Sequence, residues 1–508
     1  MVDPGRYEGS VGRLCRRTVV VAMAFAGTAV QAAMLDTGEL PPPVRQALAQ
    51  AQVPSQAMTA VVLPVDGGAP LLAWGAGKAM NPASVFKLVT TQAALEILGP
   101  AFVWNTPVWL QGTLTDGVLD GALVFKGQGD PKWTVERFWL LLRRLRQMGV
   151  AEIRGDIVID RSAFAAPDGS PGDFDGEPLR PYNVAPDALL LAQRSLVYSF
   201  TPLPARGVAL VSVEPALEGM VVDAEVALSA GPCDDWRAVL KATPADPLRM
   251  HFEGSYPRAC GEQSWPLAYA DPASFDARLI VALWRSLGGR LSGSVRNGSA
   301  PVTPPSFVLS SAPLPELVRD INKYSNNVMA QQLFLSLGLS QRGLGSADNA
   351  RLVLAGWLRE SFGGLADAAV VDNGSGLSRS QRVSAELLAQ LLLRAWHSAT
   401  MPELLASLPV AGLDGTMRRS RSSAGRAHLK TGSLRDVAAT AGYVLAADGQ
   451  RRILVALIQH PQANAARPAL EALLLWAANA PGRAKQERSQ ERAAATEPRH
   501  APRRTQKR

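Results

Sequence analysis

Hydrophobic and polar positions form a helical pattern in the first quarter of the chain. Leu88, Leu95 and Leu98 recur at a spacing that places them on one face of a helix. A helix is therefore predicted over this stretch, and it opens at Ser84. Lys87 follows Ser84 by three positions, which puts a hydroxyl and an amine on the same face of that helix.

A strand pattern dominates the end of the globular part. Residues 437–444 and 453–458 are apolar runs, and Asp448-Gly449 between them is a strong turn signal. A shorter run at 427–429 leads into Lys430-Thr431-Gly432-Ser433. The pattern predicts a strand followed by a hairpin, with Gly432 leaving room for a substrate at the strand edge.

Two similar units stand in the middle of the chain. Asp130-Pro131 and Asp271-Pro272 each begin a helical pattern, which ends at Gly149 in the first unit and at Gly288 in the second. A short apolar strand pattern follows each helix. The units are either an internal repeat or two unrelated turns from a helix into a strand.

The first residues have the pattern of a secretory signal. Arg13, Arg16 and Arg17 precede an apolar run at 18–30, and Val30-Gln31-Ala32 fits a cleavage site. We expect a signal peptide over 1–32, export to the periplasm and no transmembrane anchor in the mature chain, because the run is short for a membrane span. An amphipathic first helix is the alternative, and the pattern does not separate the two common export routes.

The net charge of +8 is carried by the two ends of the chain. Residues 1–32 contribute +2 and residues 482–508 contribute +6, so the body over 33–481 is neutral. A neutral body without a recognition motif argues against a nucleic-acid partner. We expect 482–508 to be a disordered basic tail, which either is simply solvated or touches anionic envelope polymers.

Cysteine and histidine are scarce. Export and cleavage would leave Cys233 and Cys260, and an oxidising compartment favours a disulfide between them over two free thiols. No Cys/His cluster has the spacing of a zinc site, so neither a metal nor another cofactor is expected.

Three short motifs carry the candidate chemistry. Ser84-x-x-Lys87 pairs a hydroxyl with an amine that can take its proton if burial or a nearby cation lowers the lysine pKa. Ser325-Asn326-Asn327 and Lys430-Thr431-Gly432 follow in order. Each motif alone is common, but the ordered set is typical of penicillin-interacting serine enzymes.

The chain resembles the D-alanyl-D-alanine carboxypeptidase/endopeptidases of the penicillin-binding protein 4 type from about residue 55 to 475. The resemblance implies an α+β fold in which a transpeptidase-like catalytic domain, an antiparallel sheet flanked by helices, contains a large insertion. We expect the catalytic domain over 33–103 and 304–481, the accessory domain over 104–303 and a nested strand-rich part at about 165–240. Gln128 replaces an expected glycine, and an asparagine expected after Leu191 is missing.

The resemblance also implies roles in hydrolysis of a D-Ala-D-Ala bond in peptidoglycan stem peptides. Ser84 would attack the carbonyl, Lys87 would take its proton, and Ser325 would pass a proton to the leaving amine. Lys430 would supply positive field, and β-lactams would acylate Ser84. The groups expected to bind substrate through side chain or backbone are Asn327, Thr431, Gly432 and Ser433.

Two further residues are candidates for binding charged groups of the peptide. Arg379 ends a turn-rich segment, 372–379, and its guanidinium suits a carboxylate. Asp160 ends a strand pattern and could pair with the amine of a diamino acid in the stem peptide. The alternatives are a loop whose glycines need positive φ for the first segment, and a carboxylate that caps its own turn for Asp160.

Three other classes of protein are less consistent with the chain. No G-x-S-x-G elbow surrounds Ser84, which argues against a Ser-His-Asp hydrolase. A β-lactamase shares the three motifs, but no E-x-x-L-N segment lies between Asn327 and Lys430. A penicillin-binding protein without activity is disfavoured because all three motifs are intact.

Overall fold

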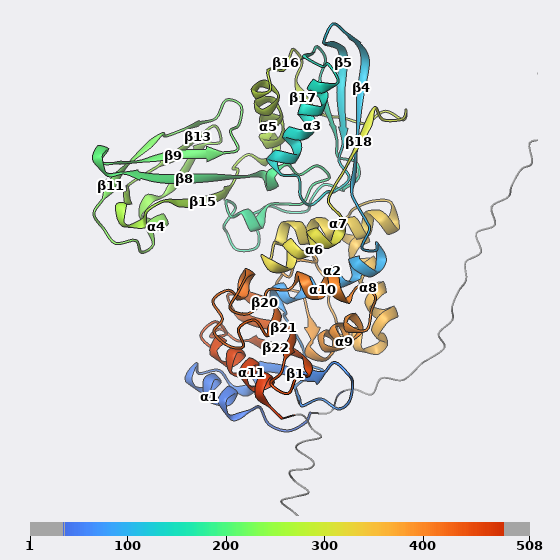
Figure 1. The fold of residues 1–508 in the computed structure, drawn as a ribbon, viewed down its shortest axis with the longest axis vertical. Coiled ribbons are helices and arrows are strands. Elements are labelled where there is room, and N and C mark those ends of the chain that lie inside the picture. The colour runs from blue at the N-terminus through green and yellow to red at the C-terminus, as the bar shows by residue number, and fades with distance from the viewer. Residues whose placement is uncertain (1–33, 35, 482–508) are drawn as a thin grey trace, which may run out of the picture. The chain divides into compact units, whose positions relative to one another are not determined.

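A computed structural model describes residue 34 and residues 36–481 (Figure 1). The expected signal peptide and the expected basic tail lie outside the described residues. In the described part no helix is both long enough and apolar enough to span a membrane.

A five-stranded antiparallel sheet forms the centre of the catalytic part, as the sequence predicted. Its spatial order is β2-β1-β22-β21-β20. The strands are β1 (Met58–Pro64), β2 (Leu72–Trp74), β20 (Ala427–Leu434), β21 (Val437–Leu445) and β22 (Arg451–Gln459). The predicted hairpin is confirmed, and Gly449 in its turn has the positive φ that the turn requires.

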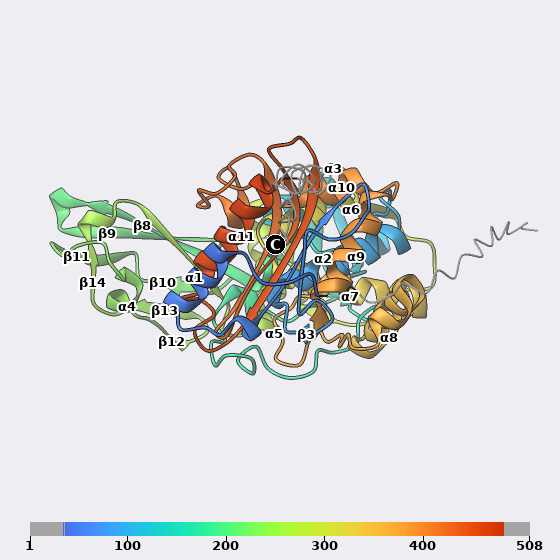
Figure 2. The ribbon, with the colours of Figure 1, turned by 90° about the horizontal axis from the view of Figure 1, so that it is seen from below.

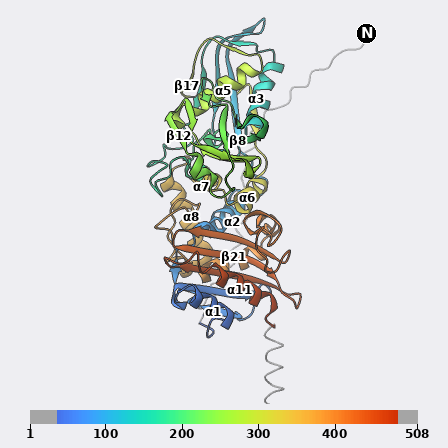
Figure 3. The same cartoon turned by 90° about the vertical axis from the view of Figure 1, so that its left-hand side faces the viewer.

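Helices cover both faces of this sheet, because successive strand residues point to opposite sides. In β1, Val61 and Leu63 pack on the side of α2 (Lys87–Ile97) and α9 (Ala385–Trp396), whereas Ala60 and Val62 face α1 (Pro42–Gln50) and α11 (Arg467–Asn479). Figure 2 shows α1 and α11 side by side, and α11 runs along the strands in Figure 3. The sheet is therefore the middle of three layers.

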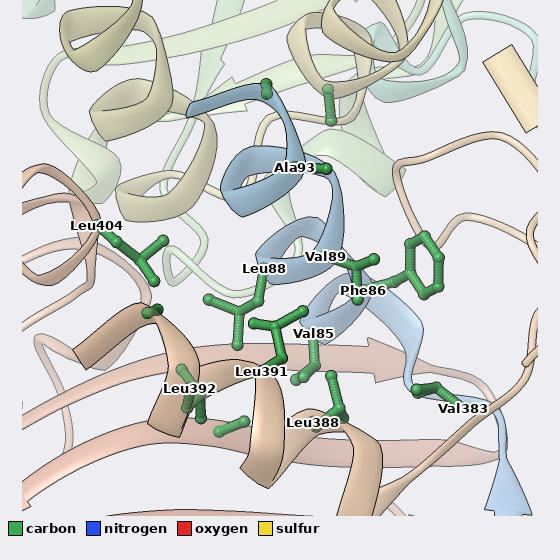
Figure 4. Close-up of a cluster of buried hydrophobic side chains, with 14 of the residues drawn as sticks. Val85, Phe86, Leu88, Val89, Ala93, Val383, Leu388, Leu391, Leu392 and Leu404 are labelled. Atoms are coloured by element: carbon green, nitrogen blue, oxygen red, sulfur yellow. The ribbon is translucent and has the colours of Figure 1, made fainter. Parts of the chain in front are cut away.

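The layer that holds α2 is the main hydrophobic core of the catalytic part. Val85, Leu88 and Val89 pack against Leu388 and other leucines of α9 (Figure 4). Further helices enclose α2: α6 (Leu314–Lys323), α7 (Asn327–Arg342), α8 (Ala347–Phe362) and α10 (Met401–Ser407). The residues that open α2 are thereby fixed on all sides.

The inserted part contains the two similar units and a sheet that joins them. Each unit has a helix followed by two short strands, and the equivalent strands pair in parallel, β6 with β16 and β7 with β17. The elements are β4 (Asn105–Thr115), β5 (Val118–Lys126), α3 (Val135–Gln147), β6 (Glu152–Ile153), β7 (Ile157–Asp160), α5 (Pro272–Ser286), β16 (Arg290–Leu291), β17 (Val295–Asn297) and β18 (Phe307–Ser310). Because β18 pairs with β4, the insertion runs past the predicted boundary at 303.

The nested strand-rich part begins and ends later than the expected 165–240. Five strands form one sheet, in the order β14-β11-β9-β8-β15, and three short strands form another. The larger sheet has β8 (Ser195–Leu203), β9 (Val208–Glu214), β11 (Glu225–Ser229), β14 (Ser255–Pro257) and β15 (Gln263–Ala268), and the smaller has β10 (Val221–Val222), β12 (Ala242–Asp246) and β13 (Arg249–Phe252). Cys233 and Cys260 are joined in a disulfide in this part.

Candidate active site

Ser84 lies where a tight 3-10 turn, η2 (Ala83–Phe86), runs into α2. Ala83 has a φ of +46°, and its N–H donates to Asn81 Oδ1 at 2.9 Å. Strand β20 presses against this turn, so that a Cβ at Gly432 would lie 2.5 Å from the carbonyl oxygen of Pro82. Glycine is therefore required at 432 by contact with the turn that presents Ser84, in addition to any approach of substrate.

Lys87 is fully buried, and its amine is surrounded by three oxygen atoms. Nζ lies 2.6 Å from Asn327 Oδ1, 2.6 Å from the carbonyl oxygen of Ser375 and 2.9 Å from Ser84 Oγ. The amide and carbonyl oxygens can only accept, so they take both N–H groups of a neutral amine. The remaining lone pair then faces the Ser84 hydroxyl, which is the geometry of a base for that hydroxyl.

The charge state of Lys87 follows from burial and from a second lysine. Burial disfavours the ammonium form, and the nearby Lys430 adds like-charge repulsion, so the pKa of Lys87 is lowered well below its ordinary value. Lys430 is also fully buried, and burial lowers its pKa to about 7. Neither amine forms an ion pair with a carboxylate in the part of the chain that the structure describes.

The second motif forms the turn between α6 and α7. Ser325 has a φ of +58°, and its Oγ accepts a hydrogen bond from Lys430 Nζ at 2.8 Å. Asn326 caps α7 by accepting from the N–H of Met329 at 2.9 Å. Asn327 therefore holds the Lys87 amine through Oδ1, while its NH2 group makes no hydrogen bond to a described residue.

The third motif lines a cavity of about 490 Å³ that also contains Ser84 and Ser325. Lys430 donates to the carbonyl oxygen of its neighbour Thr431 at 2.7 Å, and the Thr431 hydroxyl donates to Thr416 Oγ1 at 2.7 Å. Three motifs that are far apart in the sequence thus meet at one cavity. Together they provide the Ser84 hydroxyl with the Lys87 amine beside it, and the Ser325 hydroxyl bonded to the Lys430 amine.

Arg379 lies outside the lining of that cavity. Its guanidinium is stacked on the ring of Phe174, 4.5 Å from the centroid, and is 3.5 Å from Asp436 Oδ1. The loop that precedes it follows the structural alternative, because Gly374 and Gly376 both have positive φ. A Cβ at Gly376 would lie 1.9 Å from the carbonyl oxygen of Ala83.

Asp160 follows the capping alternative as well. Its side chain is buried, and its oxygens accept hydrogen bonds from the N–H groups of Ser162 and Ala300, each at 2.8 Å. Burial raises the pKa of Asp160, but these bonds outweigh it and hold the pKa below its ordinary value. These contacts are the ones that the capping alternative predicts, and a role for Asp160 in binding a substrate amine stays a prediction.

Three contributors to the site were not singled out from the sequence. The carbonyl oxygen of Ser375 holds Lys87, and a backbone carbonyl has no sequence signature. Arg467 donates to Ser433 Oγ at 2.6 Å, and Asn464 Oδ1 lies 3.2 Å from the same oxygen. One sequence feature could have pointed to Arg467. It is a cation at the start of a helix, where the helix dipole disfavours positive charge.

The chemistry-bearing groups of this cavity contain no metal-binding cluster. Across the described residues, no group of three or more His, Cys, Asp or Glu side chains is arranged to hold a metal ion. The Ser84 hydroxyl with the Lys87 amine beside it supports nucleophilic catalysis by a serine with a lysine base.

Comparisons with known proteins agree with this geometry. The model of the D-Ala-D-Ala carboxypeptidase 3 (S13) family matches residues 42–480. A D-alanyl-D-alanine carboxypeptidase from Actinomadura sp. (strain R39) is 30% identical over 420 residues, which are 77% of this chain and 75% of that protein. D-alanyl-D-alanine carboxypeptidase DacB from Haemophilus influenzae is 25% identical over 391 residues, 75% of this chain and 80% of that protein.

The fold is similar to a solved structure too. The crystal structure of penicillin binding protein 4 (dacB) from Haemophilus influenzae superimposes with a TM-score of 0.69 at 23% identity, covering 85% of this chain and 99% of that chain. The resemblance found in the sequence is thereby confirmed. The chain belongs to the D-Ala-D-Ala carboxypeptidase 3 (S13) family.

Proposed function

We propose that this protein is a serine D-Ala-D-Ala carboxypeptidase and DD-endopeptidase that acts on peptidoglycan stem peptides through an acyl-enzyme on Ser84. The observation that carries the proposal is the environment of the Lys87 amine. Two obligate acceptors hold it, no carboxylate of a described residue neutralises it, and it lies 2.9 Å from Ser84 Oγ. Family membership supplies the substrate class.

Acylation begins with transfer of the Ser84 proton to Lys87 as Oγ attacks the scissile carbonyl carbon. The oxyanion that forms would accept hydrogen bonds from the backbone N–H groups of Ser84 and Ser433. Collapse of the tetrahedral intermediate breaks the C–N bond. Ser325, bonded to Lys430 at 2.8 Å, delivers a proton to the leaving amine, and a proton from Lys87 restores the Ser325 hydroxyl.

Deacylation uses water as the second nucleophile. Water attacks the ester carbonyl and gives a proton to the neutral Lys87 amine, and Lys87 passes that proton to Ser84 Oγ as the ester bond breaks. The hydroxyls of Thr431 and Ser433, which line the cavity, would bind the terminal carboxylate, and the Asn327 NH2 group would bind the peptide amide. A β-lactam ring would acylate Ser84 by the same first step.

The cellular location is part of the proposal. An exported, periplasmic protein is the setting in which peptidoglycan is available and in which the Cys233–Cys260 disulfide is stable. The signal pattern over 1–32 supports export.

Covalent labelling tests the assignment of Ser84. Wild-type protein incubated with penicillin G is expected to gain one acyl adduct in intact-protein mass spectrometry, whereas Ser84→Ala gains none. Ser420→Ala, a serine on the same cavity wall, is the matched control and should label like wild type. Full labelling of a folded Ser84→Ala protein would falsify the assignment.

The lifetime of the adduct separates this function from a β-lactamase of the same fold. A carboxypeptidase is expected to release the penicilloyl group over minutes or longer. Turnover in milliseconds would identify a β-lactamase instead.

A further inference from the structure

Arg467 is an arginine on the wall of the catalytic cavity without an acidic partner. It is the first residue of α11, and its side chain is exposed. Nη2 donates to Ser433 Oγ at 2.6 Å and to Asn464 Oδ1 at 3.0 Å, and Nε donates to the same Asn464 oxygen at 3.2 Å. Among the described residues it forms no ion pair, so its charge is not neutralised within the protein.

The position of Arg467 costs stability in α11. A cation in the first turn of a helix interacts unfavourably with the helix dipole, by about 0.3–1 kcal/mol at an exposed site. Glu471, one turn later, lines the same cavity but accepts from Ser420 Oγ and makes no ion pair with Arg467. Local helix stability therefore gives no reason for an arginine here.

The same wall of the cavity carries further positive charge. Arg419 also lines the cavity and has no hydrogen-bond or ion-pair partner among the residues that the structure covers. The field on this side of the cavity thus favours an anionic ligand.

Ser433 is fixed by Arg467 and Asn464 together. Its oxygen accepts from the guanidinium, and its proton can be donated to Asn464 Oδ1 at 3.2 Å. A carboxylate that enters beside Ser433 could take up both the hydroxyl and the guanidinium fork. A planar fork binds a carboxylate through paired hydrogen bonds, which an ammonium cannot do.

We propose that Arg467 and Ser433 form a carboxylate-binding subsite for the residue on the leaving side of the scissile bond. The inference rests on the proposed function and adds a residue that specifies the substrate. The ligand is a D-amino acid residue whose carboxylate is one carbon from the leaving amine. Both a terminal D-alanine and the D-centre of a cross-linking diamino acid have that structure.

The size of the cavity is consistent with the larger of these two residues. Its volume of about 490 Å³ exceeds what the methyl side chain of D-alanine fills. Leu470 and Glu471 of α11 line it beyond Arg467 and would lie along a longer side chain. One subsite therefore serves both carboxypeptidase and endopeptidase cleavage, because it binds the carboxylate that the two substrates share.

The test compares Arg467→Gln with Arg418→Gln, which removes the same charge from a neighbouring residue that does not line the cavity. The substrates are an N-acylated tripeptide ending in D-Ala-D-Ala and its C-terminal carboxamide. Arg467→Gln is expected to lower kcat/KM on the free carboxylate by about tenfold to a hundredfold, as loss of a charge-assisted hydrogen bond implies. It should change kcat/KM on the carboxamide by no more than about twofold.

Two further variants show whether the loss comes from the guanidinium of Arg467 or from a general loss of charge. Arg467→Lys should recover only part of the carboxylate preference, whereas Arg418→Gln should leave it unchanged. An equal loss on both substrates, or no loss on either, would overturn the subsite.

A failure of the proposed function gives a different result. Wild-type protein would then hydrolyse neither peptide and would not be labelled by penicillin. Calorimetric binding of the carboxylate peptide then tests Arg467 directly. Weaker binding to Arg467→Gln than to Arg418→Gln supports the subsite, and equal binding contradicts it.

Discussion

The protein holds two pairs of cations largely out of solvent, and the two pairs differ in their partners. In the catalytic cavity, Lys87 and Lys430 are fully buried, and neither has a carboxylate partner among the described residues. In the inserted part, Arg161 and Arg194 share two carboxylates, Asp187 and Asp276. Arg194 Nη2 lies 2.6 Å from Asp187 Oδ2 and 2.8 Å from Asp276 Oδ2, and Arg161 Nη2 lies 2.6 Å from Asp276 Oδ2.

The presence or absence of carboxylates sets the pKa of each cation and therefore its role. Burial lowers the pKa of Lys430 to about 7. Burial and the like charge of Lys430 together lower the pKa of Lys87. Burial acts on Arg194 in the same direction, but Asp276 and Asp187 outweigh it and hold the pKa of Arg194 above its ordinary value. The first pair is therefore suited to accept protons, and the second pair to hold structure.

The structural cluster is joined to the catalytic part through one side chain. Gln332 of α7 is fully buried, accepts from the Asp187 N–H at 2.9 Å and donates to the Asp187 carbonyl oxygen at 2.9 Å. Since α7 begins at Asn327, the insertion supports the helix that places the second motif.

Removing the amine of Lys87 should have the largest effect. Lys87→Met is expected to slow acylation by penicillin G by about 10²–10⁴-fold, the contribution typical of a positioned general base. The folded state should not be weakened, because keeping Lys87 neutral below its ordinary pKa costs free energy that methionine does not. Stopped-flow or mass-spectrometric acylation rates measure the effect, and a rate within tenfold of wild type at neutral pH would show that another group is the base.

Removing one carboxylate from the arginine cluster should affect stability and leave the chemistry largely intact. Asp276→Asn leaves two partly buried guanidinium groups with one carboxylate, which should cost up to about 3–5 kcal/mol in the free energy of unfolding. Urea denaturation measures the loss, and acylation of the remaining folded protein should stay close to wild type.

An exposed ion pair of the nested part provides the control for that measurement. Glu225→Gln breaks the pair of Glu225 with Arg206 and should cost at most about 1 kcal/mol. A loss as large as that of Asp276→Asn would mean that burial does not distinguish the cluster.

The uncompensated lysines should give the protein a characteristic pH dependence of stability. The pKa of Lys430 is about 7 in the folded protein and near its ordinary value when unfolded, so the unfolded chain binds the extra proton above pH 7. Its burial destabilises the folded state fully below pH 7, and this penalty declines as the pH rises toward the unfolded pKa.

Wild-type stability should thus gain about 1 kcal/mol per pH unit from Lys430 between pH 7 and 9. Urea denaturation of wild type and Lys430→Met at both pH values measures this contribution as a difference in slope. Equal slopes would mean that Lys430 is charged in the folded protein across this range.

The link between the two regions should have the smallest effect. Gln332→Leu leaves both backbone groups of Asp187 without partners and should cost about 1–3 kcal/mol. Gln341→Leu, on the exposed end of the same helix, is the control and should be close to neutral. If the two variants are equally stable, Gln332 does not couple the insertion to α7.

Much of the catalytic part could be predicted because its signals are local. The S-x-x-K helix start and the strand–hairpin at the end of the chain are each encoded within a few residues. The sequence could not show that Asn326 caps α7 while Asn327 faces Lys87, because the role of each depends on where α7 begins. The contact of the Ser375 carbonyl oxygen with Lys87 could not be predicted, because it depends on the tertiary packing of a loop.

The insertion was less predictable for a physical reason. Several of its strands have only two to five residues, which is too short for a clear strand pattern. Residues 165–194 have a turn-forming composition and were mistaken for part of the nested sheet. Asp160 and Arg379 were predicted from their charge and from their positions at the end of a strand pattern and of a turn-rich segment. Charge does not indicate whether backbone N–H groups or an aromatic ring already occupy a side chain.

The pH dependence of penicillin acylation is the most direct test of Lys87 as a neutral base. The second-order rate constant for adduct formation on wild-type protein, measured from pH 5 to 10, should level off well below the ordinary lysine pKa of about 10.4. Lys430→Met should move the inflection upward, because the like charge that helps to lower the pKa of Lys87 is gone. A wild-type rate that keeps rising tenfold per pH unit up to pH 10 would show that Lys87 is charged in the resting protein and would contradict the mechanism.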